Sequence, residues 1–338
     1  MSAEATHGSR DVRDLSEPIR EKTFTVDFLY DGRRLDKFLR NHLRWRSRTK
    51  LQEKIRKGDV LVDGRPSKPG RLLREGETVT VKLDVPEIDL DTIPLETLYE
   101  DEHLIVLNKP AGYMVHPTGR HVFGTLLNVV HKRMKEAGEI AAGRVPLPCH
   151  RLDQFTSGTL LIAKTKDARR KLQEEFESGR VEKRYAALVE GVMECEEARL
   201  DYPIAPQVGA KRLTMEVVPH GHPSLTLVRV VERFRGGFTL VECDLKTGRT
   251  HQIRIHLAHF GHPVVCDEIY GVRTVLKRGD LGEPPAGETL LSRQALHARV
   301  LGFTHPESGE RVVVEAPLPP DMKAVVEALR LADRRRRT

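Results

Sequence analysis

One loop places a carboxylate where it could act in catalysis. In the segment PLPCHRLDQFTSGTLLIAKT, residues 146–165, a proline-rich stretch delivers Arg151 and Asp153, and the small residues at 156–158 lead into an apolar strand. Loops held by rigid strands commonly carry catalytic groups. An isolated aspartate in a turn is more often an ion-paired structural residue, so a catalytic role for Asp153 needs support from other segments.

A second segment offers a cation to pair with that carboxylate. In LKTGRTHQIRIHLAHFGHPVVCDEIYG, residues 245–271, the polar residues Gln252, Arg254 and His256 alternate with apolar ones. This alternation predicts a β-strand with one cationic face and one buried face. A partly buried arginine requires an anion, and Asp153 is the natural candidate. The pair would favour the ionised carboxylate that a nucleophile or a base needs.

Two further segments carry polar groups next to predicted strands. Tyr185 opens the strand KRYAALV and offers a ring for stacking and a hydroxyl for proton transfer. Taken alone, this tyrosine is equally well explained as an amphipathic edge residue. The segment LIVLNKPAGYMVHP, residues 104–117, places Asn108, Lys109 and His116 after an apolar strand. These three side chains could line a phosphate-binding groove or shape a turn.

The elements around these residues are mostly short strands. The runs that predict strands are HLIVLNK, GTLLIAK, KRYAALV, TLVRVVERF, FTLVECDL and RVVVEA. One helical pattern, Ala168, Leu172 and Phe176, closes at Gly179. Strands that follow one another with few helical crossovers predict an α+β domain with a largely antiparallel mixed sheet, flanked by helices and loops. Surface loops are expected at 143–148 and 271–287.

A smaller unit is predicted ahead of this domain, at residues 24–85. Apolar residues at helical spacing from Leu35 on predict one helix, and Ser47 and Gly58 would cap the two ends of a second. Two strands follow, the first ending in an Asp-Gly turn. The expected organisation is a disordered tail at 1–20, this small α+β module, a linker at 86–94, a catalytic domain at 95–325 and a basic tail at 330–338.

The small unit is strongly basic. The whole chain has a net charge of +7, but the segment 33–57 alone contains eleven basic residues and two acidic ones, a net charge of +9. Charge of one sign crowded on a surface disfavours folding by self-repulsion, and a phosphate backbone would relieve that repulsion. We therefore expect RNA contacts from Arg33, Arg34, Lys37, Arg44, Arg46, Arg48, Lys50 and Lys54.

The composition argues against several classes of protein. The 338 residues contain no apolar run of about 18, the length that a membrane-spanning helix needs, and the polar start does not resemble a secretory signal. The four cysteines are scattered without a CxxC pair, which argues against disulfide frameworks and zinc ribbons. Neither GxxxxGK nor GxGxxG follows a strand, so no nucleotide cofactor is expected. We expect a cytoplasmic monomer that needs no cofactor and no metal.

Taken together, the segments resemble the ribosomal large-subunit (RluA-type) family of pseudouridine synthases. HRLDQFTSG is similar to the family's catalytic HRLD element, and KRYAALV to its tyrosine motif. GRTHQIRIHLAHFGHPVVCDEIYG is similar to its arginine-bearing motif, and LNKPAGYMVHP to its first motif. The resemblance covers roughly residues 95–320, with the four motifs in family order. Residues 24–85 resemble the small S-four-like RNA-binding module that many of these enzymes carry.

The resemblance implies a reaction and a set of roles. The enzyme would flip a uridine out of its stack, break its glycosidic bond and join C5 of uracil to the sugar, without metal or ATP. Asp153 would attack the ribose or the uracil ring, or assist departure of the base. Arg254 would orient Asp153, Tyr185 would stack on the base and take the C5 proton, and Arg151 would fill the vacated space. Further RNA contacts would come from Asn108, Lys109, His116, His150, Arg249, Thr250, His251 and Gln252.

By the same resemblance, the partner would be large-subunit (23S-type) ribosomal RNA or a precursor particle. Two alternatives remain: the enzyme could act on tRNA, or the protein could be a catalytically silent RNA-binding factor of ribosome assembly. The histidines between His251 and His262 raise a zinc enzyme as an alternative, although they lack an HExxH spacing. A hydrolase that releases the base would need a second carboxylate, for which Asp267 and Glu268 are the candidates.

Overall fold

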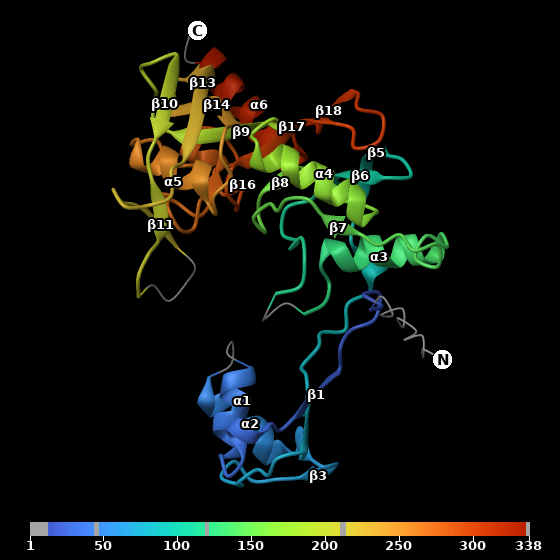
Figure 1. Ribbon diagram of the computed structural model, residues 1–338. Helices are drawn as coiled ribbons and strands as arrows, with labels where there is room; N and C mark the ends of the chain where they lie inside the picture. Colours follow the sequence, from blue (N-terminus) through green and yellow to red (C-terminus); the bar gives the residue numbers. More distant parts are fainter. Residues whose placement is uncertain (1–12, 44–46, 119–121, 210–213, 336–338) are drawn as a thin grey trace. The chain divides into compact units, whose positions relative to one another are not determined.

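The chain folds into two compact units, which Figure 1 shows in a computed structural model. The structure describes residues 13–43, 47–118, 122–209 and 214–335. The first unit comprises the chain up to Ile93 together with His116–Arg133, and the second comprises Pro94–Val115 and the chain from Met134 on. Each unit has its own apolar core.

The first unit packs two helices against a small antiparallel sheet. Its elements are β1 (Glu21–Thr25), η1 (Phe28–Tyr30), α1 (Leu35–His42), α2 (Arg48–Lys57), β2 (Val60–Val62), β3 (Arg65–Pro66) and β4 (Thr78–Lys82). The strand order is β1-β4-β2-β3, and α1 and α2, both blue in Figure 1, lie side by side. The apolar faces of both helices and of β2 and β4 form one core. The strand β1 was not predicted from the sequence.

The predicted ends of these elements are confirmed. The Ser47 hydroxyl accepts a hydrogen bond from the Lys50 amide, and Gly58 ends α2 in the left-handed conformation, with φ +84°. Asp63 and Gly64 both have positive φ, as the tight turn between β2 and β3 requires. Local sequence was sufficient here because caps and turns depend on residues close together in the chain.

The segments on either side of this module are more ordered than the sequence predicted. In the predicted tail at 1–20, the Leu15 carbonyl accepts a hydrogen bond from Asn128 in α3 (Leu126–Glu136); residues 1–12 lie outside the described part. The predicted linker forms the short helix η2 (Leu90–Thr92), in which Leu90 is buried. Asp91 of η2 pairs with Lys132 of α3. Both segments therefore pack within the first unit.

The second unit is built on a ten-stranded mixed sheet. Its main path is β10-β13-β14-β9-β17-β8-β6-β5, with β18 beside β17 and β7 beside β8. The strands are β5 (Glu96–Glu100), β6 (Leu104–Lys109), β7 (Leu147–Pro148), β8 (Ser157–Ala163), β9 (Glu182–Glu190), β10 (Glu197–Asp201), β13 (Leu225–Phe234), β14 (Phe238–Leu245), β17 (Leu296–Thr304) and β18 (Arg311–Glu315). Among the strands that the structure describes, only β8 and β17 run parallel to each other, so the predicted α+β class with a largely antiparallel sheet is confirmed. The central strand β17 was missed.

Three helices of this unit pack against the sheet and its loops. The predicted helix α4 (Lys166–Glu177) contacts β8 and β17, α5 (Gln252–His259) contacts β13, and α6 (Pro320–Arg335) contacts β13. Short elements complete the unit: β11 (Ile204–Pro206), β12 (Met215–Val217), β15 (Leu276–Lys277), η3 (Arg278–Leu281) and β16 (Thr289–Leu291). Of these, β15 and η3 lie within the loop predicted at 271–287. No helix in the described ranges is long and apolar enough to cross a bilayer.

The predicted basic tail begins inside a helix. Residues 330–335 form the last turns of α6. Arg330 pairs with Glu232 at 2.7 Å, and Arg335 pairs with Glu283. These arginines therefore hold α6 to the second unit, and 336–338 lie outside the described residues.

Candidate active site

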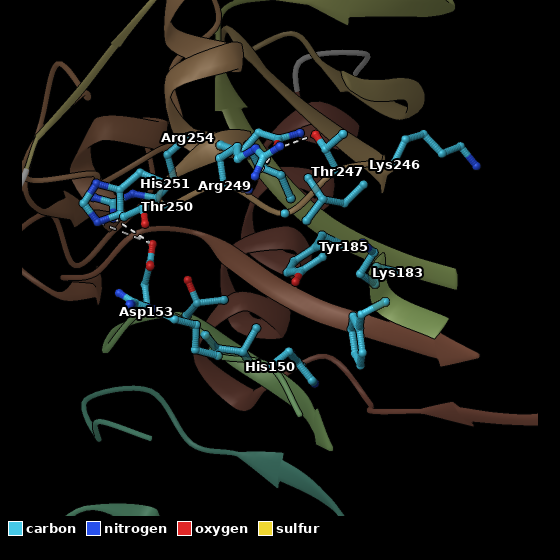
Figure 2. A pocket seen from close by; sticks show the side chains of 18 of the residues that line it. His150, Asp153, Lys183, Tyr185, Lys246, Thr247, Arg249, Thr250, His251 and Arg254 are labelled. Carbon is cyan, nitrogen blue, oxygen red and sulfur yellow. Dashed lines mark hydrogen bonds and ion pairs between the residues drawn. The ribbon is translucent and has the colours of Figure 1, made fainter. Parts of the chain in front are cut away.

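The predicted catalytic loop opens onto a cavity of about 560 Å³ in the second unit. Figure 2 shows the side chains that line it. They come from the loop before β8, the start of β9, the end of β14 with the turn that follows, the first residues of α5 and the C-terminal end of α4. Segments far apart in the sequence thus converge on one site.

The expected ion pair between Asp153 and Arg254 is present. Arg254 Nη1 donates to Asp153 Oδ2 at 2.9 Å. The Asp153 side chain is 21% exposed to the cavity, whereas that of Arg254 is only 4% exposed. A carboxylate that is open to a ligand and held by a buried cation keeps a fixed orientation.

A second carboxylate holds the other side of the same guanidinium. Asp267 accepts from Arg254 Nε at 2.6 Å and from Nη2 at 2.7 Å, and it also accepts from the backbone amides of Ile269 and Tyr270. Burial by itself raises the pKa of Asp267, but the hydrogen bonds and charge of Arg254 outweigh it and hold that pKa below its usual value. Arg254 is therefore shared between the carboxyl groups of Asp267 and Asp153.

The main chain of the catalytic loop rests on a buried lysine. Lys109 Nζ donates to the carbonyls of Pro110, Gln154 and Thr156 at 2.8–2.9 Å, and its side chain is fully buried. Burial lowers the pKa of Lys109 to about 7. We predicted a phosphate contact for Lys109, and the structure corrects this: all three of its hydrogen bonds go to backbone carbonyls, two of them in the loop that carries Asp153.

The segment that carries Arg254 is a helix, and the predicted strand is wrong. It forms α5, preceded by His251 in the left-handed conformation at φ +56°. Gln252 and His256, one helical turn apart, both contact the Thr226 hydroxyl, whereas Arg254 points to Asp153. Every residue of 252–257 is buried, so the alternation in the sequence reflects separate buried partners and not the two faces of a strand.

Tyr185 lies in the wall of the cavity. It is on β9, is largely buried, and sits between Asp153 and Lys183 in the view of Figure 2. Burial raises the pKa of the Tyr185 phenol above its usual value, and the charge of Asp153 raises it further. The free protein therefore presents a neutral phenol in the same cavity as the Asp153 side chain.

His251 completes a ring of contacts around Arg254. Its Nδ1 lies 3.0 Å from the Tyr270 hydroxyl, and its Nε2 lies 3.9 Å from Asp153 Oδ2. The Tyr270 hydroxyl accepts from the Met215 amide, so its own proton is available to Nδ1. Burial lowers the pKa of His251 despite the opposing effect of Asp153, so the imidazole is neutral at pH 7.

The remaining predicted residues of the second unit fall into two groups. Those that line the cavity are Arg151, His150, Arg249, Thr250 and His251, of which Arg151 and Arg249 are exposed. Those whose polar groups are used inside the protein are Gln252, which bonds Thr226 and the Arg249 amide, and Asn108, which donates to Glu96. Gln252 is also part of the cavity wall, but it is buried and its amide is used inside the protein, so its RNA contact stays a prediction. His116 belongs to the first unit.

The basic residues of the first unit that were predicted to bind RNA also fall into two groups, exposed residues and residues paired with acids of the fold. Arg33, Lys37 and Lys50 are exposed. Arg34 and Arg48 both pair with Asp36, a fully buried carboxylate. Lys54 is buried and pairs with Asp59 and Asp84, so its predicted RNA contact is corrected to a structural role. Arg44 and Arg46 lie outside the described residues.

The contacts of the histidines and of Asp267 argue against the two alternatives raised from the sequence, a zinc enzyme and a hydrolase. The ring nitrogens of His256 bond Thr226 and Tyr202, and Nδ1 of His262 lies 2.9 Å from the Glu190 carbonyl oxygen. Across the described ranges, no three His, Cys, Asp or Glu side chains form a metal-binding group. Asp267 is fully buried against Arg254, so it cannot act as the second carboxylate of a hydrolase.

The sequence analysis assigned no role to two residues of the site and a different role to a third. Asp267 was considered only for a hydrolase, and Tyr270 and Lys183 were given no role. Asp267 and Tyr270 both lie in the segment GHPVVCDEIYG, where the first acid after a buried apolar run could have been identified as the partner of a buried arginine. Lys183 precedes Tyr185 by two residues, the strand spacing that puts both on one face.

The comparisons with known proteins agree with this geometry. Residues 103–259 match the RNA pseudouridylate synthase family, and residues 33–79 match the S4 domain. A ribosomal large subunit pseudouridine synthase D from Xanthomonas campestris is 40% identical over 88% of this chain and 89% of its own length. An uncharacterised RNA pseudouridine synthase from Bacillus subtilis is 38% identical over 88% of this chain and 94% of its own.

A solved structure supports the assignment. Human RNA pseudouridylate synthase domain containing 1 has a TM-score of 0.51 and 27% identity, over 73% of this chain and 98% of its own. The resemblance seen in the four sequence motifs is thereby confirmed over most of the chain. With a cavity that presents an aspartate held by an arginine, and relatives of this identity and coverage, the chain belongs to the RNA pseudouridine synthases, which isomerise uridine to pseudouridine, and it carries an S4 domain at its N-terminal side.

Proposed function

We propose that this pseudouridine synthase acts on uridines of large-subunit (23S-type) ribosomal RNA, free or in a precursor particle. Relatives named ribosomal large subunit pseudouridine synthase D, including one from Pseudomonas aeruginosa at 36% identity over 92% of this chain, support that choice. The exposed cations of the S4 unit supply the sequence-independent attraction that an RNA substrate needs. The carboxylate of Asp153, partly exposed to the cavity and fixed by Arg254, is the observation that carries the chemistry.

In the proposed reaction, Asp153 drives cleavage of the bond between C1′ and N1. The carboxylate acts on the flipped nucleotide, the uracil turns in the cavity, and a bond forms between C1′ and C5. The proton on C5 leaves and N1 gains one, so the product is an isomer and no redox partner is required. Arg254 holds the Asp153 carboxylate in one orientation, which makes it a positioning residue.

Tyr185 and Arg151 are assigned the remaining steps. In this proposal the Tyr185 ring stacks on the uracil, and its hydroxyl takes part in removing the C5 proton. Because its phenol is neutral in the free protein, Tyr185 can take that proton only by passing its own to a nearby acceptor, for which Asp153 is available. Arg151, exposed at the mouth of the cavity, fills the space that the flipped nucleotide leaves.

We also propose that the enzyme works as a monomer in the cytoplasm. All four cysteines are free thiols, as expected in a reducing compartment.

The substrate is tested by mapping pseudouridine after reaction with three RNAs. Large-subunit rRNA transcripts, large-subunit precursor particles and bulk unmodified tRNA are incubated with the protein, and carbodiimide adducts are located by primer extension. We expect stops in the rRNA or the particle and none in tRNA. Stops confined to tRNA would overturn the rRNA substrate while leaving the family assignment intact.

A further inference from the structure

A buried lysine faces the cavity, and no anion in the part of the chain that the structure describes forms an ion pair with it. Lys183, on β9, is 8% exposed and lines the cavity next to Tyr185 (Figure 2). Its ammonium lies 5.8 Å from the ring centre of Phe176. Among the described residues, no carboxylate or carbonyl forms an ion pair or hydrogen bond with it.

The acids near Lys183 are committed elsewhere or turned to solvent. Asp244, the one acid whose charge acts on Lys183, pairs with Lys246 at 2.5 Å. Asp153 is held by Arg254. Glu177 lines the same cavity but is exposed. A buried charge without a partner is costly, and burial correspondingly lowers the pKa of Lys183. The protein tolerates this cost at a position that opens into its reaction cavity.

The position of Lys183 suits one part of a nucleotide. Lys183 and Tyr185 are two residues apart on one strand, so their side chains leave the same face about 7 Å apart. If the uracil stacks on Tyr185, the group that reaches Lys183 belongs to the sugar-phosphate chain on the side away from Asp153. The anion that RNA carries there is a phosphodiester, for which a compact ammonium is a suitable partner.

We propose that Lys183 binds a phosphodiester that flanks the target uridine and so fixes the flipped nucleotide in register with Asp153. This inference rests on the proposed reaction. It predicts that one flanking phosphate, unlike the rest of the backbone, is recognised inside the cavity.

The test combines one protein change with one RNA change. Short RNAs that contain a uridine modified by the wild type are made with a neutral methylphosphonate at the 5′ or the 3′ phosphate of that uridine. Binding is measured for the wild type, Lys183→Met and Lys183→Arg. The matched control is Arg184→Met, which removes the same charge from a side chain paired with Glu182 and Glu242.

We expect one methylphosphonate to weaken wild-type binding about tenfold, the size of a single charge-assisted contact. Lys183→Met should weaken binding of the unmodified RNA by a similar factor and respond less than twofold to that methylphosphonate. Lys183→Arg should retain the response in part, and Arg184→Met should retain it fully. If the losses from Lys183→Met and from both methylphosphonates simply multiply, Lys183 does not contact a phosphate and the proposal is overturned.

Stability gives a second, independent readout. Removing an unneutralised buried charge should leave the Tm of Lys183→Met equal to or above that of the wild type, because a residue kept for binding is often a liability to the fold. A Tm lowered by several degrees, with the methylphosphonate response intact, would instead make Lys183 a structural residue. If the wild type forms no pseudouridine in any of the RNAs, the proposed substrate is contradicted. This outcome can be told apart from the binding and the Tm results, which test Lys183 alone.

Discussion

Arg254 is the residue on which the geometry of the site depends. Its guanidinium spans Asp153 on the cavity side and Asp267 on the buried side. Asp267 fixes two of the arginine's nitrogens, so the third is presented to Asp153 in a single direction. A bidentate pair of this kind restricts the arginine far more than a single contact would.

The first prediction concerns Asp267→Asn. The neutral amide cannot match both guanidinium donors, so Arg254 loses its orientation and Asp153 moves with it. A shift of about 1 Å at a reacting group can lower kcat about 100-fold, and we expect a loss of that size with KM for RNA nearly unchanged. Single-turnover kinetics on a modified rRNA fragment measures both.

The control and the pH dependence sharpen that prediction. Glu268→Gln removes an exposed neighbouring carboxylate and should leave kcat within a factor of two. The depressed pKa of Asp267 stabilises the fold above the unfolded value of about 4, and this stabilisation is lost as pH falls through the lower folded value. The stability gap between wild type and Asp267→Asn in urea should therefore shrink only at acidic pH. If wild type and Asp267→Asn have equal kcat, Asp267 has no part in the mechanism.

At the scale of elements, the start of β8 is where the catalytic loop is fixed to the sheet. Gly158 has φ +113°, and a Cβ there would lie 2.0 Å from the carbonyl oxygen of Ala298 in β17. The small-residue turn in the sequence thus reflects the one parallel contact of the sheet. Only glycine permits both this backbone conformation and the close approach.

We predict that Gly158→Ala destabilises the protein by about 2–4 kcal/mol, combining backbone strain with overpacking. Gly143→Ala is the matched control, because Gly143 also has positive φ but nothing within 4 Å of the added methyl. It should cost about 1–2 kcal/mol from the left-handed conformation alone. Urea unfolding of both variants gives the difference, and equal losses would mean that β17 moves aside without cost.

The elements show how far local sequence patterns can be trusted. Caps, turns and most strands of the sheet were predicted because each depends on neighbouring residues. The segment of α5 was wrongly predicted as a strand because its polar residues are buried against different partners. Which partners bury a residue depends on the tertiary structure and not on neighbouring residues in the sequence. The phosphate contact predicted for Lys109 failed for the same reason. The sequence shows a lysine after a strand, but it does not show that the fold brings the carbonyl of a residue 45 positions away to its ammonium group.

At the scale of the whole molecule, the basic surface of the S4 unit governs attraction to RNA. Its exposed cations include Lys37, Arg40 and Lys50. The total charge of this segment was evident from the sequence, but the sequence could not separate these cations from Arg34, Arg48 and Lys54, which neutralise acids within the fold.

We predict that changing Lys37, Arg40 and Lys50 together to Gln makes RNA binding less dependent on salt. The slope of log Kd against log salt should fall by about 0.7–0.9 for each phosphate that the variant no longer neutralises. The control changes Arg299, Arg311 and Arg330, which are paired with acids of the second unit, to Gln and should keep the slope. A slope equally reduced in both triple variants would mean that net charge alone acts.

Asp153 has the central role, as the group that acts on uridine. The most direct test is release of tritium from RNA carrying 5-tritiated uridine, with wild type and Asp153→Asn compared on large-subunit rRNA. We predict release by the wild type and none by Asp153→Asn, with RNA affinity nearly equal in a gel-shift titration. Tritium release by Asp153→Asn, or loss of its activity in step with loss of RNA binding, would contradict a catalytic role for this carboxylate.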